Sequence, residues 1–538
     1  MLDALFQMSG KFKYSPKGFT SDLTLSGQIG SEAADWLSDF INLPSEVRVR
    51  PPLTVSKAHL VLEEDHKVSF TGNFSFQKGA EVFLDLLQGP DKFAINNLHI
   101  QDNESDATLE LNLGSKVFDF KCAGNLIGPT LDKIFKREIG VGSWIKGDFK
   151  THFSIDQPVK SWFEGKLEAK DVIFPWKLKE TVKIKNISLD AEKNNIKIVS
   201  ADITIGESAL TLTGDIYAAE EEFVFNIDAV ADSLDFENLK DTFAGEEADK
   251  DAEKFFDLPV KGIVRLKSDS FVFKEFKWQP LNADISVSGE KIDVAITEAG
   301  LCGIASPGSF SLKPQKVSMD FKLSAQDADL KFATACLFGT GGHMSGSYDM
   351  SSKFAGEGKS DELRESINGD LQFHAGEGRI YKGGVLAKIF AVLNFTEIFR
   401  GNLPDLVQEG FSYKSIEAIS TIQGSTLHID KTVIDGSSMT IVGKGEVDLF
   451  TSHMDLEILL APLKTVDFFI KNTPGVRSIF GESLISIPVK VTGDYSNPEV
   501  KISPTSGVSS SVLNIMKNTL KTPFNIIKPI IPDNKEKE

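Results

Sequence analysis

Apolar and polar residues alternate along most of this chain, in segments of five to eight residues that are separated by turn residues. The alternation is clearest between Lys382 and Pro504, where several such segments follow an apolar segment at 383–399. Period-two alternation predicts a β-sheet with one apolar face and one wet face. The sequence upstream repeats the pattern, so at roughly 15 residues per strand and connection we expect about 30 strands.

The regularly spaced apolar residues of these segments are the candidate residues of the apolar face. Polar side chains such as Asp455 and Lys490 fall between them and would face water. The candidates are Leu210, Leu212, Phe223, Phe225, Ile227, Met319, Phe321, Leu323, Val447, Leu449, Leu456, Ile458, Leu460, Ile487, Val489 and Val491.

Glycine recurs inside the predicted strands, as at Gly214 and Gly445. A strand glycine marks a bulge, a bend or a close approach of two backbones, so its recurrence indicates a sheet that keeps twisting. The predicted fold class is mainly β, with a long twisted antiparallel sheet. Such a sheet could pack against a second sheet as a sandwich or curl around its own apolar face, and the alternation permits both.

A few segments read as short helices that serve as lids or end caps. They lie at 31–44, 130–139, 384–399, 464–480 and 509–521. The segment at 384–399 is the candidate lid, and its candidate residues are Leu386, Ile389, Phe390 and Leu393.

The chain divides most clearly at the acidic stretch 241–257, which predicts a solvated linker or loop. This gives β repeats at 1–240, the linker at 241–257, a second β region at 258–507, and an amphipathic helix with its tail at 508–538. The apolar, mildly basic tail would suit a membrane surface or would pack over the open end of the sheet, and its composition does not separate the two.

The amino-acid composition limits the classes of partner that this chain is expected to bind. The formal charge of −19 repels phosphate backbones and argues against nucleic acid. The chain has 40 Phe against 6 Tyr and 5 Trp, and a buried Phe needs no hydrogen-bond partner, so the bias fits a large dry apolar surface. An ordinary phenylalanine-rich β core would show the same bias.

The sequence carries no motif for catalysis. It has no GxSxG, its GxG fragments never complete GxGxxG, and its eight histidines are scattered without HxxxH. We therefore expect a protein that is not an enzyme, with no metal and no cofactor. Of the three cysteines, Cys302 and Cys336 lie in a predicted strand region and could form a disulfide in an oxidising compartment, although buried free thiols fit equally well.

From Leu258 onward, a series of weak motifs keeps its order and spacing. The series includes INGDLQFHAGEGRIYKGG, LPDLVQEGFSYKSIEA, IDGSSMTIVGKGEVDL and IPVKVTGDYSNPEVKISP. This region, roughly Leu258 to Pro532, resembles the C-terminal region of the AsmA-like proteins of Gram-negative bacteria. Residues 1–240 are similar to that family only in their repeated strands.

The resemblance implies a sheet curled into an elongated apolar groove, lined by the candidate residues above. It implies a periplasmic protein, anchored in the inner membrane, that binds phospholipid acyl chains and supports lipid transport to the outer membrane. Its partners would be phospholipid and the two membranes or their proteins. The anchor helix of the family is absent from this chain, so we expect a fragment or another anchor. The alternative is a structural factor for outer-membrane protein assembly that carries no lipid.

Overall fold

We describe the fold from a computed structural model. It describes residues 3–521 except 16–17, 41–47, 64–66, 91, 138–139, 174–179, 244–258, 290, 339–343, 360–361, 382–385, 387, 390–409, 463–485, 495–496 and 505–506. Two lid candidates, Phe390 and Leu393, most of the predicted acidic linker, and the helices predicted at 464–480 lie outside the described residues.

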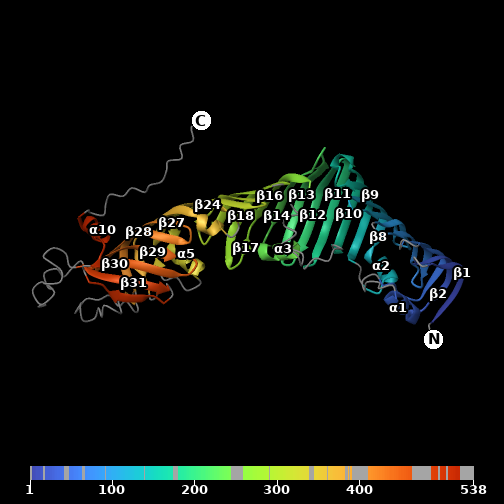
Figure 1. The fold of residues 1–538 in the computed structure, drawn as a ribbon, viewed down its shortest axis with the longest axis horizontal. Coiled ribbons are helices and arrows are strands. Elements are labelled where there is room, and N and C mark those ends of the chain that lie inside the picture. Colours follow the sequence, from blue (N-terminus) through green and yellow to red (C-terminus); the bar gives the residue numbers. More distant parts are fainter. Residues whose placement is uncertain are drawn as a thin grey trace, which may run out of the picture. The chain divides into compact units, whose positions relative to one another are not determined.

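The described residues form 32 strands, which confirms the mainly β fold predicted from the sequence (Figure 1). Contacts divide the chain into two compact units, residues Met1–Thr297 (unit 1) and Glu298–Glu538 (unit 2). Apart from β19, which spans the division, the strands of unit 1 are β1 (Ala4–Ser15), β2 (Gly18–Ile29), β3 (Leu53–Leu62), β4 (Val68–Phe76), β5 (Glu81–Gln88), β6 (Phe93–Gln101), β7 (Asp106–Leu113), β8 (Val117–Ile127), β9 (Val141–Ser154), β10 (Trp162–Ile173), β11 (Val182–Lys193), β12 (Asn195–Ile205), β13 (Ser208–Ala218), β14 (Phe223–Ala231), β15 (Leu234–Asp235), β16 (Val260–Ser268), β17 (Phe271–Phe273) and β18 (Phe276–Ser288).

The remaining strands are β19 (Lys291–Leu301), β20 (Ile304–Ala305), β21 (Gly308–Lys313), β22 (Lys316–Asp329), β23 (Met344–Ser345), β24 (Ser347–Gly358), β25 (Asn368–Ala375), β26 (Gly378–Ile380), β27 (Phe411–Gln423), β28 (Thr426–Gly436), β29 (Met439–Asp448), β30 (His453–Pro462), β31 (Ile487–Asp494) and β32 (Glu499–Ile502). The described α-helices are α1 (Ser31–Phe40), α2 (Gly128–Ile134), α3 (Phe236–Phe243), α5 (Leu330–Phe338) and α10 (Ser510–Lys521). None of the helices within the described ranges is long and apolar enough to cross a membrane.

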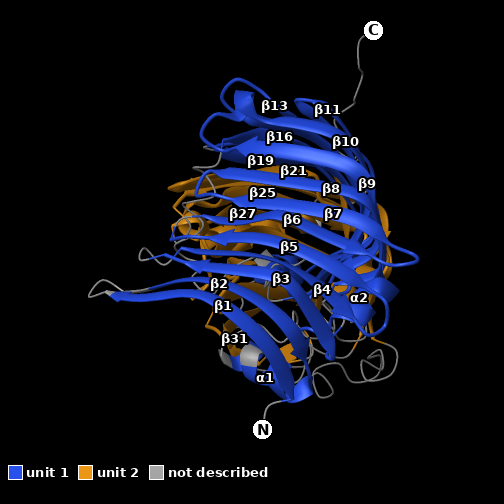
Figure 2. Ribbon diagram, turned by 90° about the vertical axis from the view of Figure 1, so that its right-hand side faces the viewer, with its two compact units in different colours: residues 1–297 blue, residues 298–538 orange. Residues whose placement is uncertain are grey.

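The strands of unit 1 follow one another as antiparallel neighbours from β1 to β14 and bend along their length (Figure 2). The wholly antiparallel sheet predicted from the sequence is wrong at one place, because β14 pairs with β16 in parallel, as β15 does with β17. Parallel pairing needs a crossover connection of a dozen or more residues, which 232–259 provides. The strands that flank the predicted acidic linker thus pair with each other, and the predicted domain limits stay a prediction.

Bulges keep the apolar side chains on one face where the sequence loses its alternation. In β12, Ile198 pairs with Gly214, but the next aligned pair is Ala201 with Leu212. One strand advances three residues while its neighbour advances two, so Ala201 and Ile203 return to the face of Ile198.

The glycine at Gly214 belongs to a close approach of two backbones. A Cβ there would lie 2.1 Å from the carbonyl oxygen of Asn226 on β14, and the φ of Gly214 is +143°. A larger residue would push the two strands apart.

Unit 2 continues the same construction. From β21 the antiparallel order is β22, β24, β25, β27, β28, β29, β30, β31 and β32. The apolar residues again pair across strands, as Ile458 with Val489 and Leu456 with Val491.

Candidate functional site

The candidate residues of unit 1 lie on one face of β13 and β14. We call this face, together with the matching face of β1 to β12, the unit 1 face. Leu212 pairs with Ala229, and Leu210 pairs with Ala231 on one side and Ile203 on the other. All five candidates of this unit, Leu210, Leu212, Phe223, Phe225 and Ile227, are only partly buried. The sheet therefore presents a run of apolar side chains that the described part of unit 1 does not seal.

One edge of the unit 1 face is covered by two helices. Ala33 and Ala34 of α1 and Leu131 and Ile134 of α2 pack against apolar residues at the strand ends. Helix α1 is held by the residue that precedes β1, because the Asp3 carboxylate accepts a hydrogen bond from the Ala33 amide at 3.0 Å. This bond lowers the pKa of Asp3.

Helix α2 is fastened by a buried carboxylate. Asp102 has a side chain only 1% exposed, and it accepts hydrogen bonds from Lys133 at 2.6 Å and from the Thr130 hydroxyl at 2.9 Å. Burial alone would raise the pKa of Asp102, but these bonds and those from the amides of Glu104 and Ser105 outweigh it and lower the pKa to about 2. The carboxylate serves the fold, since its bonds are all internal.

The opposite edge of the unit 1 face carries a cluster of phenylalanines. The ring of Phe153 lies 4.8 Å from that of Phe163 and 5.7 Å from that of Phe223, and Phe118 is 6.1 Å away. Of this cluster, only Phe223 is among the candidate residues predicted from the sequence. The excess of Phe over Tyr and Trp was the signal, but the cross-strand register needed to group these rings was not available.

Charged side chains occupy the reverse of the unit 1 sheet and pair across strands. Glu110 bonds Lys121 at 2.6 Å, and Asp228 accepts two bonds from Arg265 at 2.6 and 3.1 Å. The Arg265 bond lowers the pKa of Asp228. These pairs are largely exposed, so each adds little stability, but together they fix which side of the sheet faces water.

The candidate residues of unit 2 lie on the corresponding face of its strands, which we call the unit 2 face. Leu460, Val489 and Val491 are at most 2% exposed. Others that pack against the same cluster are Leu323, Val447, Leu456, Ile458 and Ile487. Met319 and Phe321 are partly exposed, and Leu449 follows the end of β29 with half of its surface exposed.

Segments outside the strands cover the unit 2 face. Leu330 and Ala333 of α5 belong to its buried cluster, and so does the lid candidate Ile389, which is fully buried. Leu386 packs against the same cluster. The neighbouring Lys388 donates hydrogen bonds to the Asn497 side chain and, at 3.3 Å, to the Pro498 carbonyl.

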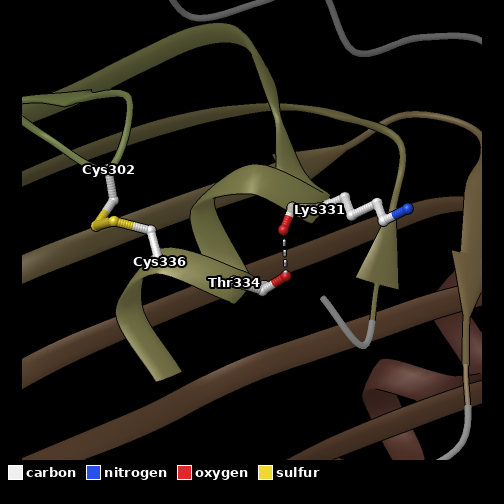
Figure 3. The surroundings of a disulfide bond; sticks show 4 residues. All are labelled: Cys302, Lys331, Thr334 and Cys336. Carbon is white, nitrogen blue, oxygen red and sulfur yellow. Dashed lines mark hydrogen bonds between the residues drawn. A yellow bond between two sulfur atoms is a disulfide. The ribbon is translucent and has the colours of Figure 1, made fainter. Parts of the chain in front are cut away.

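A disulfide ties α5 to the loop that follows β19. Cys302 and Cys336 are joined, with their Cα atoms 5.6 Å apart, and Figure 3 shows the helix held by this bond. Inside the helix, the Thr334 hydroxyl bonds the Lys331 carbonyl at 3.3 Å (Figure 3). The disulfide restricts the position of α5, the helix that covers the unit 2 face.

Helix α10 packs on the reverse of the unit 2 sheet. Val512 and Met516 are buried against Val442, Leu459 and Ala461, which point away from the unit 2 face. This described part of the predicted tail covers sheet surface. In this part of unit 2 the sheet is apolar on both sides.

The described residues offer little reactive chemistry. They contain no group of three or more His, Cys, Asp or Glu that could hold a metal ion. The free thiol of Cys122 is buried on the unit 1 face, and burial raises its pKa to about 11. Tyr413 donates a hydrogen bond to the Ser345 carbonyl at 2.6 Å, and burial raises its pKa to about 12. Neither group is activated for nucleophilic attack at neutral pH.

Comparison with known proteins fits this architecture. The sequence model of the family described as YhdP protein matches residues 177–500, more than half of the chain. The chain belongs to the YhdP family. The match spans strands of both units, and it confirms the resemblance to AsmA-like proteins.

A curated relative of the YhdP family is the intermembrane phospholipid transporter YhdP of Escherichia coli (strain K12). It is 26% identical over 218 residues, which cover 38% of this chain and 16% of the relative. The matched part is therefore a small share of that protein.

Proposed function

We propose that this chain binds the acyl chains of phospholipids along the unit 1 face and supports phospholipid transport between the inner and outer membranes. Its place would be the periplasm, and it would change no covalent bond of the lipid. Family membership supports phospholipid as the cargo, because the E. coli relative is named as an intermembrane phospholipid transporter.

The observation that carries the proposal is the partly exposed unit 1 face. Leu212 of β13 and Phe225 and Ile227 of β14 lie on this face, and the described residues leave them partly exposed. Burying acyl chains there gains about 0.8 kcal/mol per CH₂ group removed from water. The polar reverse of the sheet remains hydrated, so the same sheet contacts water on one face and lipid on the other.

Lipid analysis tests this proposal. The protein is purified without detergent, its lipids are extracted for mass spectrometry, and its uptake of a fluorescent phosphatidylethanolamine from vesicles is measured. We expect bound phospholipid and saturable uptake. A preparation that carries no lipid and takes up none would contradict the proposal and would favour a scaffold for outer-membrane protein assembly.

A further inference from the structure

Helix α5 covers the unit 2 face with few buried side chains of its own. Leu330 and Ala333 of this helix belong to the buried cluster of unit 2, and Leu337 packs against that cluster. Phe332 and Phe338 are instead exposed, with 57% and 66% of their surface open to solvent. The largest side chains of α5 therefore contribute little to its contact with the sheet.

The contact between α5 and the sheet is small. The free energy gained by burial is roughly proportional to the apolar area removed from water, and here that area comes mainly from one leucine and one alanine. The helix has nine residues, and isolated helices shorter than about 12–15 residues are marginally stable in water. The position of α5 therefore depends on attachments other than packing.

The two ends of α5 are attached differently. At its start, the Leu330 amide donates a hydrogen bond to the Gly346 carbonyl at 3.0 Å. In its last turn, Cys336 is bonded to Cys302 (Figure 3). Opening the disulfide would remove the covalent attachment of the last turn while the first turn stays attached, so α5 would move as a hinged cover.

The disulfide is open to chemical attack from solvent. Cys302 is 6% exposed, whereas Cys336 is exposed. A dithiol reductant attacks the Cys336 sulfur as a thiolate, which forms a mixed disulfide and releases the Cys302 thiolate. The second thiol of the reductant then displaces Cys336 and closes the reductant's own disulfide. Two electrons and two protons pass from the dithiol to the two cysteines, and the reverse exchange closes the bond again.

A buried hydroxyl group lies in the cluster that α5 covers. Tyr348 of β24 is 3% exposed, and it pairs with Ala328 of β22, two residues before α5 begins. Its hydroxyl has no hydrogen-bond partner among the described residues. Burial raises the pKa of Tyr348, so the hydroxyl keeps its proton and is able to donate. A buried donor without a partner is unfavourable, so this position favours a ligand that brings an acceptor.

A phospholipid supplies both an apolar surface and an acceptor. Its acyl chains suit Leu323, Met350 and Phe373, which lie on three neighbouring strands and pack against the cluster while only partly buried. The ester carbonyl at the start of each acyl chain is an uncharged acceptor. A phosphate group would have to lose its water on entering such an apolar cluster, which is far more costly. The ester group is therefore the part of the lipid that fits the Tyr348 hydroxyl.

We infer that α5 is a hinged lid over a second acyl-chain site, on the unit 2 face, and that the Cys302–Cys336 disulfide holds this lid closed. With the bond open, acyl chains take the place of Leu330 and Ala333, and the Tyr348 hydroxyl donates a hydrogen bond to an ester carbonyl. This inference rests on the proposed function and adds to it a second site that thiol–disulfide exchange controls.

The test maps where a lipid contacts the full chain. A phosphatidylethanolamine with a diazirine in one acyl chain is cross-linked by light, and the labelled peptides are identified by mass spectrometry. The oxidised chain is compared with the chain reduced by dithiothreitol and with the double variant Cys302→Ser, Cys336→Ser. Hydrogen exchange in β27 to β30 shows whether the sheet of unit 2 stays folded.

We expect the oxidised chain to be labelled in unit 1, and the reduced chain and the double variant to be labelled also in β22, β24 or β25. Hydrogen exchange in α5 should become about 30-fold faster when the bond is open. The double variant should not respond to dithiothreitol. Equal labelling of unit 2 in the oxidised and reduced chains, or labelling of unit 1 alone in every state, would overturn the inference.

Two further outcomes separate the explanations. If neither unit is labelled in any state, the proposed function itself fails. If reduction removes the protection of β27 to β30 together with that of α5, the disulfide supports the whole sheet of unit 2, and the assignment of α5 as a lid is wrong.

The hydroxyl group is tested separately in the reduced chain. A diester phosphatidylethanolamine should label unit 2 about fivefold more than its diether analogue, because only the ester offers a carbonyl. Tyr348→Phe should remove this difference. Tyr413→Phe is the matched control and should keep it, because the Tyr413 hydroxyl is already bonded to the Ser345 carbonyl. Equal labelling of unit 2 by the two lipids in the unaltered reduced chain would contradict the role of Tyr348.

Discussion

The two apolar faces have the same sequence pattern but different surroundings. On the unit 1 face, Leu212 and Phe225 are partly exposed, and the helices α1 and α2 cover one edge only. On the unit 2 face, Val489 and Val491 are buried together with residues of α5 and with Ile389. The described residues leave the first face partly exposed, whereas the second is packed with protein side chains.

The difference shows that alternation places apolar residues on one face of a sheet but does not determine what packs against that face. The apolar side of such a strand must be covered by protein side chains or by a ligand, because exposed apolar surface is unfavourable. In unit 2 the chain supplies the cover itself, through α5 and the residues around Ile389. In unit 1 we propose that phospholipid covers the apolar face.

The sharpest way to test the comparison is to place a charge on each face. Val489→Asp should destabilise unit 2 by about 3 to 5 kcal/mol, because an isolated carboxylate would be buried without a partner. Phe225→Asp should cost unit 1 far less, because the carboxylate remains in contact with water, but it should reduce lipid uptake. Urea unfolding followed by hydrogen exchange in each unit measures both effects.

The matched control for these variants is a charge on the wet side of a strand. Asn226→Asp lies next to Phe225 on the exposed side of β14 and should change neither stability nor uptake. If Phe225→Asp unfolds unit 1 as strongly as Val489→Asp unfolds unit 2, the unit 1 face is a sealed core and the contrast disappears.

The disulfide offers a second test, restricted to unit 2. Replacing both Cys302 and Cys336 by Ser should reduce the stability of unit 2 by about 2 to 4 kcal/mol, the usual effect of opening a loop of this length. Unit 1 should be unaffected. Reductant should give the same loss in the unaltered protein and none in the double variant. Cys122→Ala controls for the general loss of a thiol, and a stability unchanged by reductant would contradict this role.

Acid should weaken unit 1 through Asp102. Its folded pKa of about 2 lies below the value of about 3.9 expected in the unfolded chain. The stability it provides is therefore present above pH 4 and is lost as the pH falls towards 2. Asp102→Asn should cost about 2 to 3 kcal/mol at neutral pH, because Lys133 loses its partner, and should flatten the pH dependence between 4 and 2.

Urea unfolding of both proteins at pH 6, 4 and 3 measures this effect. Asp106→Asn is the control, because it makes the same change of charge away from α2. Asp106 is an exposed partner of His99 on the neighbouring strand. A pH profile of Asp102→Asn that matches the unaltered protein would contradict the assignment.

The smallest effect is expected from the reverse of the unit 2 sheet. Val512→Ala removes two buried carbon groups from the contact of α10 with Leu459 and should cost about 1.5 kcal/mol. Lipid uptake by the unit 1 face should not change. Leu513→Ala, on the exposed side of the same helix, is the control, and faster hydrogen exchange in α10 and β30 of the Val512 variant alone would support the packing.

The sequence by itself determined the strands, their two-sided character and the approximate number of them. The alternation of Leu456, Ile458 and Leu460 is local, and a pleated strand converts it directly into a face. The start of α1 after Gly30 and the end of α10 before Pro523 were also predicted well, because helix boundaries depend on nearby residues.

Only the tertiary structure decided which faces are covered and how strands far apart in sequence pair. The parallel pairing of β14 with β16 and the bulge that returns Ala201 to the face of Ile198 depend on hydrogen bonds between strands, which no local pattern encodes. The burial of Val489 and the exposure of Phe225 depend on whether another segment reaches that face. A period of two places a side chain on a face, whereas long-range contacts decide what lies opposite it.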